Sequence, residues 1–137
     1  MGKPNFNGKW SMYKSEKFED YLRANGADDA VIRMATSVQQ DVEIHQNEDK
    51  FLIKILNVMC TRNTEFTVGE EFDYEAHGGI RTKGQPFWDG DKLVITFTPV
   101  NPDEAKIHII KRQLVGEEML QTMQVDDIIC KRFFRRA

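Results

Sequence analysis

The chain has 137 residues, 40% of them hydrophobic and 30% charged, and a formal net charge of −3. This length and composition are typical of one globular domain with its own core, so we treat residues 1–137 as a single domain. The slightly acidic balance argues against nucleic acid as a partner, because nucleic-acid-binding proteins need a strongly basic face.

Signals for membrane insertion, secretion and metal binding are not found in the sequence. No apolar stretch approaches the roughly 18 residues of a membrane span, and no secretory signal precedes the folded-looking sequence. His45, His77 and His108 do not have the spacing of metal ligands, so we expect neither a metal nor another cofactor. Cys60 and Cys130 are interpreted as free thiols, which favours a cytoplasmic protein.

A helical pattern follows the first strand-like segment and extends from Glu16 to about Val38. Phe18, Tyr21 and Leu22 fall at positions i, i+3 and i+4, so they share one face of a helix. We expect Ser15 to cap this helix.

The pattern predicts two short helices rather than one. Asn25-Gly26 is a typical helix end. Asp28-Asp29 marks the start of a second helix, because acidic residues favour the positive N-terminal end.

From residue 47 onward, turn-forming residues recur between short runs rich in Val, Ile, Phe, Thr and Met. Such regular spacing predicts an all-β barrel or sandwich. Two short helices cannot cover a large sheet, so we expect the sheet to close on itself. The turn signals are Asn47-Glu48-Asp49, Gly69, Gly78-Gly79, Asp89-Gly90-Asp91, Asn101-Pro102-Asp103, Gly116 and Asp126-Asp127.

The order strand, two helices, meander resembles the intracellular lipid-binding proteins, the family of fatty-acid-binding and cellular retinoid-binding proteins. The resemblance covers essentially the whole chain and implies a closed antiparallel up-and-down β-barrel of about ten strands with a two-helix cap near the N-terminus. It is carried by Phe6-Asn7-Gly8-Lys9-Trp10, Val68-Gly69-Glu70-Glu71-Phe72, Trp88-Asp89-Gly90-Asp91-Lys92-Leu93 and the segment from Gly116 to Phe134.

Arg132 has support from the residue pattern itself. Alternation in the last strand places it on one face with Ile128, Cys130 and Phe134, and the other face holds the remaining charges. An arginine in a strand is more often solvated than inward. The resemblance favours the inward interpretation, because acid-binding members place an arginine on each of two late strands.

Arg112 matches the other family position, but its strand alternates poorly. Ile109 and Ile110 fall on opposite faces, so the pattern alone leaves Lys111 as an alternative inward residue. Because a buried guanidinium costs several kcal/mol unless it is paired, an inward arginine here favours a carboxylate ligand.

The resemblance also ranks the two arginines and suggests apolar contacts. Phe134 stands where many relatives have Tyr, so a hydroxyl that could hold the carboxylate near Arg132 is missing. In this the chain resembles the intestinal type, which implies Arg112 as the principal anchor and Arg132 as part of the surrounding polar network. By position, Phe18, Tyr21, Met59, Met123 and Phe134 are expected to line the cavity or its entrance, with an ordinary core role as the alternative for each.

We therefore expect a monomeric cytosolic carrier for a fatty acid or similar hydrophobic carboxylate. One alternative is retinoic acid, because Pro4-Asn5-Phe6 and the segment from Asp126 to Cys130 are similar to retinoic-acid carriers. Another is a lipid-switched regulator that binds a partner, or that delivers its ligand by transient membrane contact through the helical cap. We expect no enzymatic activity and no catalytic residues, because no nucleophile and base pattern or phosphate-binding glycine loop is found.

Overall fold

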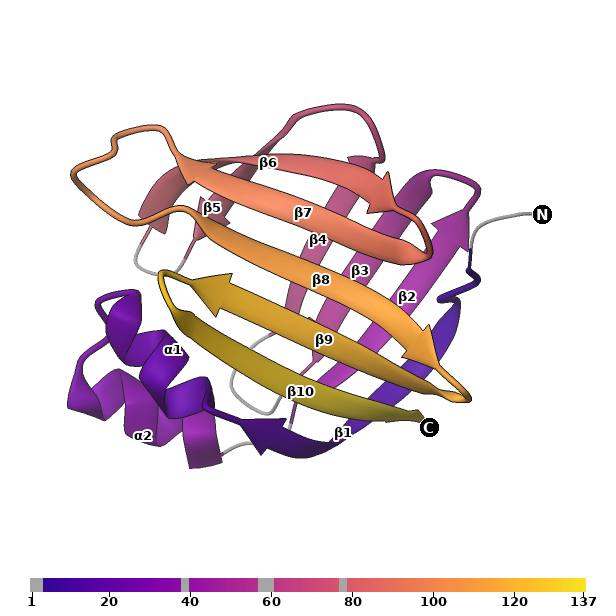
Figure 1. Cartoon of the computed structure of the whole chain (residues 1–137), viewed down its shortest axis with the longest axis horizontal. Helices are drawn as coiled ribbons and strands as arrows, with labels where there is room; N and C mark the ends of the chain where they lie inside the picture. The colour runs from indigo at the N-terminus through magenta and orange to yellow at the C-terminus, as the bar shows by residue number, and fades with distance from the viewer. Residues whose placement is uncertain (1–3, 38–39, 57–60, 77–78) are drawn as a thin grey trace.

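The computed structural model describes residues 4–37, 40–56, 61–76 and 79–137. It is an antiparallel ten-stranded barrel with two short helices after the first strand, as the sequence predicted (Figure 1). No helix in the described ranges is long and apolar enough to cross a membrane. The elements are β1 (Gly8–Glu16), α1 (Phe18–Ala24), α2 (Asp29–Ser37), β2 (Asp41–Asn47), β3 (Lys50–Leu56), β4 (Thr61–Thr67), β5 (Phe72–Ala76), β6 (Ile80–Asp89), β7 (Lys92–Pro99), β8 (His108–Val115), β9 (Glu118–Val125) and β10 (Ile128–Arg136).

The strands follow one another around the barrel, and β1 joins the two halves. The sheet order is β4-β3-β2-β1-β10-β9-β8-β7-β6-β5, so the first strand pairs with both β2 and the last strand. The ends of this sheet, β4 and β5, are not paired within the described residues. Side chains fill the seam between them, where the rings of Phe66 and Phe72 stack with centroids 5.2 Å apart.

The predicted turns connect these strands, except that Gly78 of the Gly78-Gly79 signal lies outside the described residues. Gly90 and Gly116 adopt positive φ angles of 61° and 63° in two-residue hairpin loops, a conformation that glycine takes without steric cost. The loop from residue 100 to residue 107, between β7 and β8, is longer. It extends at the same end of the barrel as the helices (Figure 1).

The helices follow the predicted pattern, but the first cap differs. Ser15 lies inside β1, in register with Arg132, so its prediction as an N-cap was wrong. Lys17 precedes α1 instead, with a φ of 59° and no side-chain cap. The second helix starts where Asp28-Asp29 predicted, and Asp28 also caps it, because the backbone N–H of Val31 donates to Asp28 Oδ1 at 2.9 Å.

A dense core fills the part of the barrel away from the helices. Its buried members come from β1, β2, β3, β4, β7, β9 and β10, and partly buried side chains of β5, β6 and β8 pack against them, so side chains close this part of the barrel. A smaller cluster lies beneath α1, where Tyr21 packs on Met123, Val125 and Cys130. The open space of the barrel is therefore confined to the helical end.

Candidate ligand-binding site

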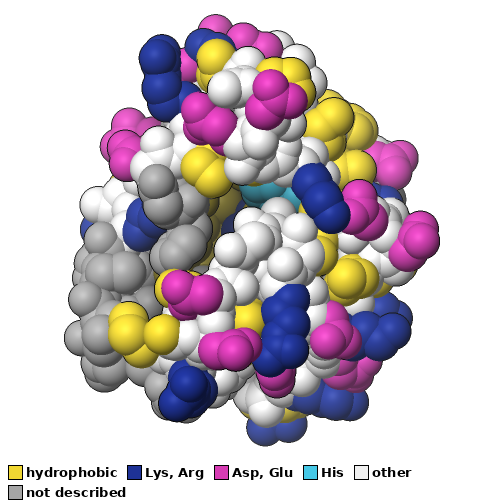
Figure 2. Space-filling model, turned by 90° about the vertical axis from the view of Figure 1, so that its left-hand side faces the viewer, with side chains coloured by type: hydrophobic (Ala, Val, Ile, Leu, Met, Phe, Trp, Pro, Cys, Tyr) yellow, Lys and Arg dark blue, Asp and Glu magenta, His cyan; other side chains and the backbone are white. Residues whose placement is uncertain are grey.

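A cavity of about 250 Å³ lies inside the barrel beneath α1. Figure 2 views the helical end and shows a hollow there, with hydrophobic side chains and a histidine ring in it and charged side chains around it. The cavity is largely apolar, with a few polar groups. The residues that line it are Phe18, Tyr21, Leu22, Asn25, Gln40, Ile53, Ile55, Arg62, Thr64, Phe66, Tyr74, Ile80, Thr82, Ile95, Phe97, Pro99, Ala105, Lys106, His108, Ile110, Arg112, Gln121, Met123 and Arg132.

Arg112 and Arg132 both face this cavity. Arg112 on β8 and Arg132 on β10 each lie in register with Gln121 on the intervening strand β9. The three side chains are 3–5% exposed. Lys111, which the sequence left as an alternative, lies on the outer face in register with Thr122. The strand pairing thus makes Arg112 the inward residue.

Burial leaves these arginines short of partners. No described acidic residue forms an ion pair with either, and the Nε atoms of both lack a hydrogen-bond partner. Burial lowers the pKa of each guanidinium to about 10, so both stay charged at neutral pH. Two buried positive charges therefore face one cavity without a described counter-charge.

Of the two arginines, Arg132 makes more contacts with protein side chains. Its Nη1 donates a hydrogen bond to Gln40 Oε1 at 2.5 Å, and its guanidinium carbon lies 3.9 Å from the centre of the Phe18 ring. These contacts join β10 to α1 and to the segment before β2. No comparable contact is found for Arg112 among the described residues, so its guanidinium is the freer one.

The apolar residues predicted from the sequence divide into three groups. Phe18, Tyr21 and Met123 line the cavity. Phe134 is fully buried in the core cluster at the closed end and is not a lining residue, so its contact with a ligand stays a prediction. Met59 lies outside the described residues.

Several lining residues were not predicted. Gln121 shares the inward face of β9 with Met119 and Met123, and its amide donates to Met123 Sδ at 3.1 Å. Alternation along β9 would have identified it. Arg62 and Tyr74 come together from β4 and β5, and no local pattern signals a contact between those strands.

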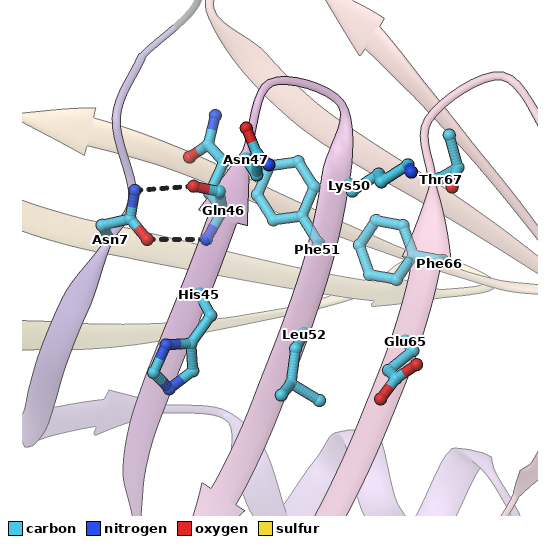
Figure 3. A pocket seen from close by; sticks show the side chains of 10 residues that line it. All are labelled: Asn7, His45, Gln46, Asn47, Lys50, Phe51, Leu52, Glu65, Phe66 and Thr67. Atoms are coloured by element: carbon cyan, nitrogen blue, oxygen red, sulfur yellow. Dashed lines mark hydrogen bonds between the residues drawn. The ribbon is translucent and has the colours of Figure 1, made fainter.

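A second hollow, of about 600 Å³, lies at the outer rim of β2, β3 and β4 (Figure 3). It is open, and Asn7 and Gln46 in its lining are hydrogen-bonded to each other. Asn7 Nδ2 donates to the carbonyl of Gln46 at 2.9 Å, and the Gln46 N–H donates to Asn7 Oδ1 at 2.6 Å. This hollow has no buried unpaired charge, and the inner cavity is the better candidate site.

Comparison with known proteins gives one consistent result. The sequence model described as the lipocalin / cytosolic fatty-acid binding protein family matches residues 7–137. Cellular retinoic acid-binding protein 1 of Takifugu rubripes is 35% identical over 97% of this chain and 98% of its own, and the Homo sapiens protein is 34% identical with the same coverage.

Solved structures agree with this assignment. The structure of human cRBP IV is 27% identical, covers 98% of this chain and 99% of its own, and superposes with a TM-score of 0.88. That of the REP1-NXSQ fatty acid transporter is 27% identical, covers 96% and 95%, and has a TM-score of 0.87. The chain belongs to the lipocalin / cytosolic fatty-acid binding protein family.

Proposed function

We propose that the protein is a carrier that reversibly binds one long-chain fatty acid in its inner cavity. One observation supports this most strongly: Arg112 and Arg132 are buried, charged and without a described acidic partner in the same apolar space. A ligand carboxylate supplies the missing charge and accepts hydrogen bonds in the fork geometry of a guanidinium. The proposal is a binding function without catalysis.

We assign Arg112 as the principal anchor of the carboxylate. Arg132 already uses the Gln40 amide and the Phe18 ring, whereas the Arg112 guanidinium has more unused donors. Gln121 lies between the two arginines, and its Oε1 has no hydrogen-bond donor in the described part of the chain. An ordered water bridging these groups would complete the network around the acid.

The alkyl chain contributes most of the affinity in this proposal. Each buried methylene is worth about 0.8 kcal/mol before entropy losses. The cavity of about 250 Å³ is smaller than the roughly 300–1,000 Å³ of typical ligand pockets. A long-chain ligand therefore requires lining side chains to move, and one of them is Phe18 on α1, whose ring centre lies 3.9 Å from the Arg132 guanidinium carbon.

Retinoic acid is a second candidate ligand. It is also a hydrophobic carboxylate, and the relatives named above are retinoic acid-binding proteins. Retinol is disfavoured, because its alcohol cannot neutralise two buried arginines. Mass spectrometry of lipid extracted from the purified protein separates the two acids.

We further infer that the carrier acts as a cytosolic monomer whose helices make transient contact with membranes. The helices cover the end of the barrel that holds the cavity, and Met34 on α2 is 53% exposed. Transfer to anionic vesicles that slows as salt concentration rises would support contact delivery. Transfer independent of vesicle charge and of salt would argue for simple diffusion.

The central test compares palmitic acid with its methyl ester and with the alcohol of equal length. The tail contribution is the same in each, so the difference isolates the head group. We expect the acid to bind about ten- to a hundred-fold more tightly, the value of a charge-assisted hydrogen bond of about 1.5–3 kcal/mol. Equal binding of the three ligands would overturn the proposal.

A further inference from the structure

A third arginine, Arg62, lines the same cavity. It lies on β4 with Thr64 and Phe66, on the inward face of that strand. Its guanidinium carbon is 4.5 Å from the centre of the Tyr74 ring on β5. The function proposed above assigns no role to this residue.

The contact between Arg62 and Tyr74 crosses the seam where β4 and β5 are not paired. The neighbouring contact across the seam is the stack of Phe66 on Phe72. Tyr74 is itself held by Phe97, whose ring centroid is 4.8 Å away. The stacking therefore holds the Arg62 side chain at the cavity wall, and its N–H groups stay available for an anion.

The charges around the cavity do not balance. Its described lining includes Arg62, Arg112, Arg132 and Lys106 but no Asp or Glu. Lys106 has a partner, because its Nζ lies 2.5 Å from Asp126 Oδ2. Among the described residues, none of the three arginines forms an ion pair. A ligand with a single carboxylate neutralises the Arg112 region and leaves Arg62 without a counter-charge.

Arg62 and Arg112 belong to different walls of the cavity. Around the ring of strands, β5, β6 and β7 lie between β4 and β8 once the seam is crossed. In a ring of ten strands this places the two arginines four strands apart, on different walls. A ligand whose one end binds at Arg112 can therefore reach Arg62 only with a different group, at another point along its chain.

We propose that Arg62, supported by Tyr74, forms a second anion subsite, and that the cavity selects a hydrophobic chain with an acidic group at each end, such as a long-chain dicarboxylic acid. The inference rests on the proposed carrier function and adds a ligand class to it. One acid binds at Arg112, and the other binds at Arg62 near the seam. A neutral group at the second end leaves the Arg62 charge unpaired.

The test uses hexadecanedioic acid, its monomethyl ester and palmitic acid, measured by calorimetry on the full chain. The diacid and monoester share their length and their first carboxylate, so they differ only at the second end. We expect the unmutated protein to bind the diacid roughly tenfold more tightly, as for one charge-assisted hydrogen bond in a partly solvated site. In Arg62→Gln this preference should disappear while palmitic acid binding is retained, and Arg62→Lys should keep part of it.

Arg81→Gln is the matched control, because Arg81 is an exposed arginine of β6 outside the cavity lining. It should keep the full preference for the diacid. Equal binding of diacid and monoester by the unmutated protein, or a preference that survives in Arg62→Gln, overturns the second subsite. If palmitic acid still binds normally in those cases, the proposed carrier function is not contradicted. If palmitic acid also fails to bind, the carrier function and the subsite both fall.

Discussion

Arg112 and Arg132 lie in register with the same residue, Gln121, so the two guanidinium groups reach one cavity from either side of β9. Both are charged at neutral pH and both are almost fully buried. Their surroundings differ, because among the described residues only Arg132 has a hydrogen-bonded amide and a stacked ring. This difference leads to the first prediction.

Arg112→Gln should weaken palmitic acid binding more than Arg132→Gln. We expect a loss of about ten- to a hundred-fold for the first, because a charge-assisted hydrogen bond to the carboxylate is removed. The Arg132 substitution should reduce the affinity for palmitic acid less, because that side chain is already bound by Gln40 and Phe18. Displacement of a fluorescent fatty acid measures both, and Arg81→Gln is the surface control. The reverse ranking would place the carboxylate beside Arg132.

The Arg112 substitution should also change stability in a ligand-dependent way. An unpaired buried charge destabilises the empty barrel, so Arg112→Gln should leave its free energy of unfolding unchanged or raise it by about 1 kcal/mol. Saturating palmitic acid should stabilise the unmutated protein by about 2.7 kcal/mol at a concentration of one hundred times Kd, and the variant by less. Urea unfolding with and without ligand measures both quantities. A strongly destabilised empty variant would show that Arg112 has a structural partner.

Phe18→Ala should speed ligand release. The Phe18 ring covers the Arg132 guanidinium at 3.9 Å and attaches α1 to the barrel, so its loss loosens the cavity entrance. Cation–π contacts of this kind are worth about 0.5–2 kcal/mol. Stopped-flow transfer to vesicles measures the release rate.

Tyr13→Ala provides the matched control for that experiment. Tyr13 on β1 stacks on Arg135 of β10, the strand that also carries Arg132, at the same distance of 3.9 Å but on the outer face of the barrel. It should leave the release rate nearly unchanged. Similar acceleration by both substitutions would mean that release follows overall stability rather than the α1 contact.

The unfolding free energy should fall as pH rises through the alkaline range. Burial raises the pKa of the Cys130 thiol from 9.0 to about 11, so the folded state favours the protonated form. The resulting stability is complete below pH 9 and is lost progressively between pH 9 and 11. The loss attributable to Cys130 should be about 1–3 kcal/mol. Cys130→Ala should flatten this part of the profile in urea titrations, and an unchanged slope would contradict the assignment.

Gly84→Ala should destabilise the protein by about 1–3 kcal/mol through overpacking. A Cβ at Gly84 would lie 2.5 Å from Phe72 Cε1, and Phe72 is stacked against the seam. Adding Phe72→Leu should recover part of the loss, because the smaller side chain makes room. Thermal unfolding by circular dichroism checks both variants. No destabilisation in the single variant would show that the Phe72 ring moves freely.

The sequence determined the fold to a large extent, because the relevant signals are local. Turn residues such as Asp89-Gly90 and Gly116 mark the hairpins, and period-two alternation in the last strand placed Arg132 on the face without other charges, which the family resemblance then indicated as the inward face. The stripe of Phe18, Tyr21 and Leu22 indicated α1. Each of these features depends on residues a few positions apart.

Long-range pairing decided the remaining features. Ser15 carries a capping side chain, but pairing of its backbone with Arg132 extends β1 past it. The alternation of β8 left Arg112 and Lys111 equivalent, and its register with β9 turned Arg112 inward, since a one-residue shift exchanges the two faces of a strand.

Only the tertiary structure determines which residues line the cavity. Arg62 and Tyr74 are separated along the chain by a turn and meet because the sheet curls until β4 faces β5. Curvature is a property of all ten strands together, set by twist and by the closing of exposed edges. A sequence pattern can state which side of a strand is inward, but only the closed barrel decides which inward residues share one space.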